Sequence, residues 1–269
     1  MLASTRPTFA VDAALARAVV YQMLSIAFQP PTEIRLARIG GRDRFCTVVA
    51  ALRFLDESRQ GPLAAAASHL ASLSVPDVDH LSACYFRLFG HTARGLVCLC
   101  ETEYGPGNGF HQPQQLADIA GYYVAFGLRA TNASEARPDH LASECEFMDF
   151  LNRKTAHLGE RVAVDASEFA ETLELTQAAE WSFLRDHLGR FGRAAGNQLV
   201  AEDREGYFGA VGHLLVAFVE AECARVGVRA GPTDLALRPE EPDDTPMACG
   251  SADQADQLIS IQGLGRSTT

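Results

Sequence analysis

The stretch RPDHLASECEFMDFL, residues 137–151, decides the fold. Pro138 suits the first position of a helix, because its missing N–H is not needed there. Asp139 is then expected in the first turn, where a carboxylate complements the exposed N–H groups. Apolar residues follow at helical spacing, at Leu141, Cys145 and Met148. The stretch therefore predicts an amphipathic helix that begins at Pro138 and runs to about residue 157.

Helical periodicity continues on both sides of this stretch. Apolar residues recur every three to four positions through most of residues 11–226, and no segment shows the sustained alternation that is typical of a strand. We expect helices over residues 11–28, 32–39, 43–57, 63–73, 77–89, 113–126, 138–157, 165–187, 192–201 and 203–226. The sequence therefore predicts an all-α fold, a single-domain helical bundle of about nine to eleven helices.

Two segments depart from the helical pattern. Residues 90–112 hold five glycines and two cysteines, and a loop of this length is usually functional or disordered. Residues 229–269 contain four prolines and an acidic run, which predicts a poorly structured tail. We therefore divide the chain into an all-helical domain, 1–228, and an acidic, proline-containing tail, 229–269. We expect the fold to survive removal of this tail.

Charge and hydropathy restrict the partners and the location. The formal net charge of −11 argues against a nucleic-acid partner, because phosphate binding needs a basic face. An acidic surface would attract a basic peptide, although acidity that only maintains solubility is the simpler explanation of charge alone. The first ten residues lack the apolar core of a secretory signal, and the chain has no run of about 18 consecutive apolar residues. We therefore expect a cytoplasmic protein without membrane insertion.

The sequence also lacks several catalytic motifs. Lys154 is the only lysine and follows Arg153, so the chain has no phosphate-binding P-loop. An enzyme that uses His140 with Asp139 or Glu144 would need a nucleophile or a metal in reach, and none is evident beside them. We therefore expect a protein that is not an enzyme.

The seven cysteines leave one alternative open, a metal or redox sensor. Cys98 and Cys100, with His91 or His111 and with Cys249, could supply ligands. Their Cys-x-Cys spacing is uncommon for zinc, however, and reduced thiols in a loop and a tail are the simpler interpretation. We therefore expect no metal and no cofactor of the protein's own.

A polar edge beside an apolar wall remains as the candidate binding region. His140 and Glu144 are four residues apart and share a helix face with Asp139 nearby. Met148 belongs to the neighbouring apolar stripe, and methionine surfaces adapt to varied apolar partners. Such a groove could accept a peptide with arginines beside an apolar run. The alternatives are that Asp139 only starts a helix and that Met148 is only a core residue.

The order of these motifs resembles the TorD/DmsD/NarJ family of chaperones for molybdenum redox enzymes. The segments that carry the resemblance are residues 85–90, 103–104, 116–128 and 137–151. The resemblance implies an all-helical domain that binds the N-terminal leader, often of the twin-arginine type, of a molybdopterin-containing catalytic subunit of the DMSO reductase superfamily. Export would wait until the cofactor is in place. Cys98, Cys100 and the long tail resemble the branch that serves type II enzymes of this superfamily.

The resemblance also implies which residues take part. The pair Asp139 and His140 corresponds to the leader-binding region of the family. The residues that we expect around the leader are Tyr85, Phe89, Glu103, Tyr104, Asp139, His140, Glu144 and Met148. We expect a monomer or a homodimer.

Overall fold

The described part of the chain is built from α-helices. The computed structural model describes residues 5–40, 42–56, 60–73, 77–90, 95–105, 112–129 and 137–238. Within these residues the α-helices are α1 (Thr5–Ala27), α2 (Glu33–Gly40), α3 (Arg42–Leu55), α4 (Pro62–Ser72), α5 (Val78–Phe89), α6 (Gln112–Ala125), α7 (Leu141–Val162), α8 (Ala166–Asp186), α9 (Leu188–Glu202) and α10 (Tyr207–Arg225). A short 3-10 helix, η1 (Glu101–Glu103), lies between α5 and α6. The predicted all-α fold is confirmed, with ten α-helices and no strand in the part described.

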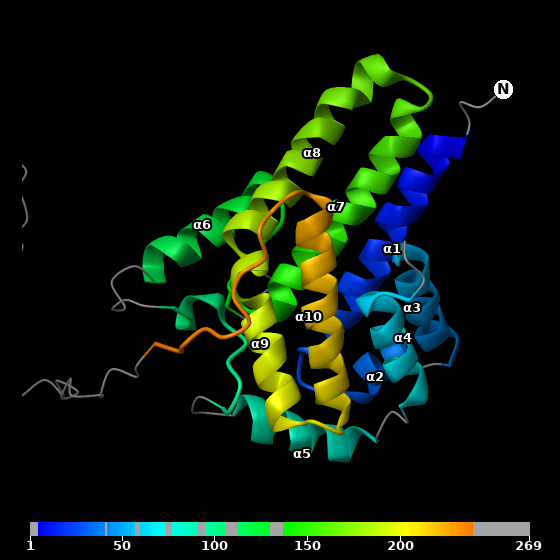
Figure 1. The fold of residues 1–269 in the computed structure, drawn as a ribbon. Helices are drawn as coiled ribbons and strands as arrows, with labels where there is room; N and C mark the ends of the chain where they lie inside the picture. The colour runs from blue at the N-terminus through cyan, green and yellow to red at the C-terminus, as the bar shows by residue number, and fades with distance from the viewer. Residues whose placement is uncertain are drawn as a thin grey trace, which may run out of the picture. The chain divides into compact units, whose positions relative to one another are not determined.

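The long helices α1, α7, α9 and α10 form the centre of the bundle. α1 packs along α7 and α9 along α10, while α5 crosses the lower end of the bundle and α6 lies beside α8 (Figure 1). The facing sides of these helices and of α8 carry fully buried aromatic rings, among them Tyr21, Phe147, Phe183, Phe191 and Phe218. Burial of such rings contributes a large share of the hydrophobic stabilisation.

Glycines allow α9 and α10 to approach closely. A Cβ atom on Gly196 would lie 2.8 Å from Val216 Cγ2, and one on Gly212 would lie 2.7 Å from the Gly196 carbonyl oxygen. Contacts this short are sterically forbidden for a real side chain, so the helix crossing needs glycine at both positions.

Several helix boundaries differ from the sequence expectation. α1 begins at Thr5 instead of residue 11, and α7 ends at Val162 instead of near residue 157. α7 begins at Leu141, with His140 as its N-cap, so Pro138 and Asp139 precede the helix instead of forming its first turn. The cap explains the difference, because His140 Nδ1 accepts a hydrogen bond from the Ala142 N–H at 3.1 Å. α9 begins at Leu188, directly after α8, where the sequence indicated a later start at residue 192. Gly127 closes α6 with φ 74°, as expected of a C-terminal glycine.

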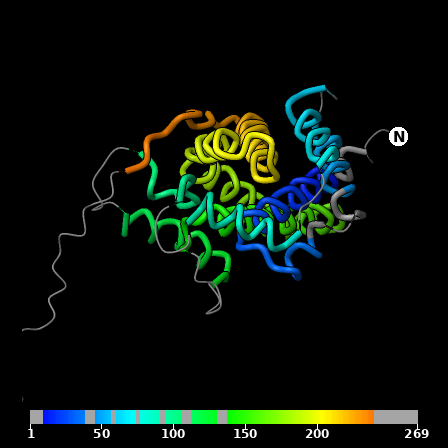
Figure 2. Tube along the Cα trace, turned by 90° about the horizontal axis from the view of Figure 1, so that it is seen from below, coloured from blue at the N-terminus to red at the C-terminus, as the bar shows by residue number. Residues whose placement is uncertain are grey.

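Residues 229–238, which the sequence assigns to the tail, are bonded to the bundle. The Gly231 N–H donates to the Gly189 carbonyl at 2.8 Å, and the Arg238 N–H donates to the Glu103 carbonyl at 2.8 Å. This segment runs along α9 toward η1 (Figure 2). These ten residues are therefore packed, although the sequence indicated a poorly structured tail from residue 229, and survival of the fold without the tail stays a prediction. The tail from residue 239 lies outside the described residues, so the domain division stays a prediction.

Within the described residues, two helices are long and apolar enough, by length and composition alone, to cross a membrane. The apolar stretches are Ala10–Ala27 in α1, which is 61% buried inside the protein, and Tyr207–Arg225 in α10, which is 72% buried. Core helices of a folded bundle pass the same test, and α1 and α10 lie at the centre of this one.

Candidate functional site

The segment 95–105, which lies between α5 and α6 in the chain, is hydrogen-bonded to the end of α5 and to the start of α7. The Val97 N–H donates to the Leu88 carbonyl at 2.8 Å, which attaches the segment to α5. At its other end the Leu141 N–H donates to the Leu99 carbonyl at 2.7 Å. These backbone bonds place η1 directly against the beginning of α7, so residues from the glycine-rich loop and from the 137–151 stretch meet in one region.

Asp139 is the centre of the polar contacts in this region. Its carboxylate is fully buried and accepts from the Thr102 N–H at 3.1 Å and from Thr102 Oγ1 at 2.7 Å. The Arg137 guanidinium donates to both carboxylate oxygens, from Nε and from Nη2, at 3.0 Å each. A buried carboxylate with four donors holds its neighbours firmly. Asp139 therefore fixes η1 to the start of α7.

Arg137 extends this cluster to the surface. Its Nη1 donates to Glu103 Oε1 at 3.0 Å, and its side chain is 42% exposed. Burial alone would lower the pKa of Arg137, but the Asp139 charge more than offsets this and raises it. The guanidinium is thus permanently charged and forms, with Glu103, the exposed side of the cluster.

A second buried group lies beneath Asp139. His187, at the junction of α8 and α9, places its Nδ1 3.0 Å from Glu101 Oε2. Glu144 is fully buried beside them, and burial, with the Glu101 and Asp139 charges, raises its pKa well above the ordinary range. Neither oxygen of an ionised Glu144 has a hydrogen-bond partner in the described part of the chain. A neutral Glu144 can donate its proton to Glu101 instead, so we take it as protonated at neutral pH.

His140 is held as a neutral cap. Its Nδ1 accepts the Ala142 N–H, a role that a protonated ring cannot fill. Burial lowers the pKa of His140 to about 4, even though the Asp139 charge acts in the opposite direction. The ring is therefore an uncharged part of the helix start at neutral pH.

The aromatic side of the region lies at the end of α5. The Tyr85 hydroxyl donates to the Phe28 carbonyl at 3.2 Å, and its ring packs edge-on against Phe89 at 4.7 Å between centroids. Phe89 continues the contact to Phe208 on α10 at 5.4 Å. Next to this cluster, Phe86 is 41% exposed and Leu96, in the segment 95–105, is 50% exposed. The end of α5 thus presents apolar surface beside the segment.

The eight residues expected around a leader divide by exposure. Five are buried, namely Tyr85, Tyr104, Asp139, Glu144 and Met148, and three are half-buried, namely Phe89, Glu103 and His140. They fall into an aromatic group on α5 and a polar group at the start of α7, with Met148 two turns into the core. The structure connects the two groups through the segment 95–105 but does not expose all eight on one groove wall.

Sequence reasoning missed four members of the polar group, namely Glu101, Thr102, Arg137 and His187. Thr102 and Arg137 lie within stretches that the sequence singled out, and an arginine two residues before an aspartate was a usable signal for Arg137. His187 is on another helix, far along the chain, and nothing local marks it as a partner of Glu101.

The Cys100 thiol in the segment stays protonated. A hydrogen bond with Cys98 and burial raise the pKa of Cys100, which keeps the reactive thiolate form scarce. Within the residues that the structure describes, no three His, Cys, Asp or Glu side chains come together as a metal site. His91, His111 and Cys249 lie outside those residues.

Comparison with known proteins places this region in a family. The family model described as nitrate reductase delta subunit matches residues 54–197, more than half of the chain. The matched range contains α5, the segment 95–105 and the start of α7. The comparison with curated proteins finds no match. The chain therefore belongs to the nitrate reductase delta subunit family, whose NarJ/TorD-type members are typically soluble chaperones of molybdoenzyme maturation and not enzymes.

Proposed function

We propose that this protein binds the N-terminal leader of a molybdopterin-containing catalytic subunit of the DMSO reductase superfamily in the cytoplasm. It would hold a twin-arginine leader until the cofactor and partner subunits are in place, and so delay export. The observation that carries the proposal is that the family match, residues 54–197, includes the whole region built around the segment 95–105.

The exposed groups of that region suit the two halves of such a leader. The exposed Phe86 and Leu96, with the half-buried Phe89, offer apolar surface for its hydrophobic run. Glu103 offers a carboxylate for its arginines, and its side chain is 24% exposed. Arginine binds carboxylates in a bidentate manner, which favours this pairing. The net charge of −11 would further attract a basic segment.

Asp139 would act on the leader indirectly. Its oxygens are already bound by Arg137 and Thr102, and its side chain is fully buried. A leader arginine would reach it only by displacing Arg137. We therefore assign Asp139 to positioning η1 and Glu103, and the direct contacts to Glu103 and the apolar groups.

Titration with a leader peptide tests the proposal. The peptide would be taken from the catalytic subunit that copurifies with the protein, in an Arg-Arg and a Lys-Lys form. We expect Leu96→Glu and Glu103→Gln each to weaken binding of the Arg-Arg form by about tenfold, the equivalent of roughly 1.4 kcal/mol. Val164→Glu is the matched control, because Val164 is 88% exposed at the α7–α8 turn. If all three variants bind the peptide as tightly as the unaltered protein does, the binding site lies elsewhere on the protein.

A further inference from the structure

A cavity of about 680 Å³ opens between α1, the end of α3, the start of α4 and α10. Its walls are largely apolar and include Leu55, Leu63, Ala217 and Ala221. The volume lies within the range of small-molecule pockets, roughly 300–1,000 Å³. None of its lining residues belongs to the leader-binding region described above.

One charged side chain in this cavity lacks a full set of partners. Arg17, on α1, is only 10% exposed, and its Nε donates to Asn152 Oδ1 at 2.9 Å. Its nearest carboxylate oxygen, Glu222 Oε2, is 3.9 Å from Nε. Within the part of the chain that the structure describes, its two terminal nitrogens have no acceptor. Burial lowers the pKa of Arg17, although the Glu222 charge acts against this.

The carboxylates around Arg17 are bound to other groups. Glu222 accepts from Arg225 Nε at 3.0 Å and Nη2 at 2.9 Å, and from the Tyr21 hydroxyl at 3.2 Å. The same Arg225 also binds Glu180 on α8. Arg225 thus pairs with both buried carboxylates. Arg17 is the cation of the network whose nearest carboxylate oxygen is farthest away, at 3.9 Å.

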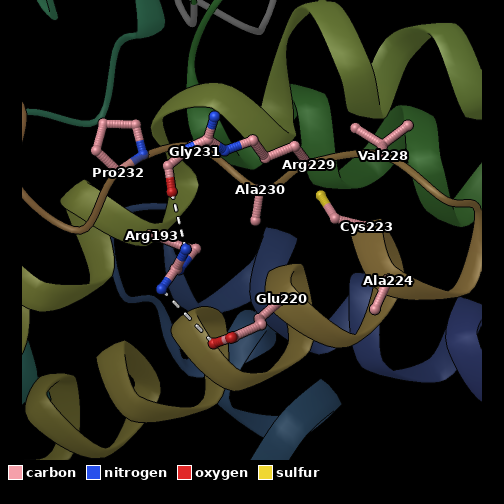
Figure 3. Close-up of a pocket in the computed structure, with 9 residues that line it drawn as sticks. All are labelled: Arg193, Glu220, Cys223, Ala224, Val228, Arg229, Ala230, Gly231 and Pro232. Carbon is pink, nitrogen blue, oxygen red and sulfur yellow. Dashed lines mark hydrogen bonds and ion pairs between the residues drawn. The ribbon is translucent and has the colours of Figure 1, made fainter.

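The two remaining acidic residues of the lining are also engaged. Asp56 Oδ2 accepts the Ala64 N–H in the first turn of α4, at 2.8 Å. Glu220 directs its carboxylate toward Arg193, 3.8 Å away in the neighbouring cavity (Figure 3). The terminal nitrogens of Arg17 are not among the fully buried side-chain atoms that lack a partner, so they are accessible from the cavity. The lining of the cavity therefore combines the Arg17 guanidinium with apolar side chains of α3, α4 and α10.

We infer that this cavity binds a small organic anion, with a carboxylate or phosphate head on the terminal nitrogens of Arg17 and an apolar body along α4 and α10. The head forms charge-assisted hydrogen bonds with the guanidinium, which are stronger than hydrogen bonds between neutral groups. The body covers the alanine and leucine side chains of the walls. The ligand class is an amphiphilic acid or an apolar phosphate ester.

Calorimetric titration of the full chain with octanoate, octyl phosphate and neutral octanamide tests this inference. We expect either anion to bind at least tenfold more tightly than octanamide. The tighter of the two identifies the head group as carboxylate or phosphate. Equal binding of octanamide, or binding of none of the three, overturns the inference.

Two variants locate the site. Ala221→Phe fills the cavity from α10 without touching the charge network, and we expect it to reduce anion binding at least tenfold with the melting temperature nearly unchanged. Arg17→Gln should remove the preference for the anions over octanamide, and Arg204→Gln, at an exposed position, is its control. If Arg17→Gln fails to fold, Ala221→Phe alone decides: anion affinity equal to that of the unaltered protein overturns the site.

Discussion

Asp139→Asn removes one charge from the centre of the polar cluster while it preserves the shape of the side chain. In the folded protein the carboxylate accepts four hydrogen bonds, two from Thr102 and two from Arg137. An amide offers one acceptor oxygen, and its NH2 group would face donors. At least one of these contacts is therefore lost and the charge pairing with Arg137 disappears.

The structure sets the size of the effect. Removing one member of a buried ion pair typically costs about 3–5 kcal/mol. Arg137 is 42% exposed, so water can satisfy part of its guanidinium and reduce the cost. We expect a loss of about 2–4 kcal/mol in the free energy of unfolding. For a chain of this size that corresponds to a melting temperature lower by roughly 5–15 °C.

Chemical denaturation of Asp139→Asn, Thr102→Val and the double variant measures the effect. Because Thr102 Oγ1 and Asp139 are in direct contact, the two changes should couple by about 1–2 kcal/mol. Asp149→Asn, on α7 itself, is the matched control. Asp149 pairs with Arg153, which is 46% exposed, so this change should cost less than about 1 kcal/mol. Stability of Asp139→Asn within about 1 kcal/mol of the unaltered protein, without coupling, would refute a structural role for Asp139.

Four further changes test the electrostatics and the packing. The pKa of Glu144 is raised in the folded protein, so the stability that Glu144 contributes is complete below its unfolded-state pKa and is lost as pH rises toward its folded-state pKa. The free energy of unfolding should therefore fall by up to about 1.4 kcal/mol per pH unit in this range. Glu144→Gln should abolish this dependence, as measured by denaturation at several pH values. The pKa of His140 is lowered to about 4, so the stability that His140 contributes is lost as pH falls from about 6.5 to 4. In His140→Asn, the free energy of unfolding should therefore depend less steeply on pH in this range. Gly212→Ala should destabilise by roughly 2 kcal/mol or more, because its Cβ would lie 2.7 Å from a carbonyl oxygen of α9, and an unchanged unfolding midpoint would contradict this crossing. Truncation after Arg229 should lower the melting temperature by several degrees through the lost bonds of residues 231–238, and a midpoint equal to that of the full chain would count against their packing.

The helical architecture was predictable because it depends on local pattern. Apolar spacing and Pro or Gly signals indicated most of the helices, including the C-terminal cap at Gly127. Boundaries that depend on side-chain capping were not predictable in the same way. Pro138 marks a plausible helix start, but the ring of His140 caps α7 two residues later and leaves Asp139 outside the helix.

That the 137–151 stretch and the loop before α6 lie close together was predictable, whereas the burial of their side chains was not. The sequence identified the 137–151 stretch and the loop before α6 as one functional region, and the segment 95–105 brings them together. It could not show that Asp139 is buried against Thr102, or that His187 reaches Glu101 from another helix. Such contacts depend on tertiary packing, which has no period in the sequence.

The most direct test of the proposed function is the identity of the protein that the full chain holds in its own cells. The tagged chain would be purified from the cytoplasmic fraction, and its partner would be identified by mass spectrometry together with the state of the partner's N-terminus. We predict a molybdopterin-containing catalytic subunit that still carries its leader, and we predict that deletion of that leader abolishes copurification while Leu96→Glu weakens it. Recovery of the subunit in equal amount without its leader would contradict leader recognition.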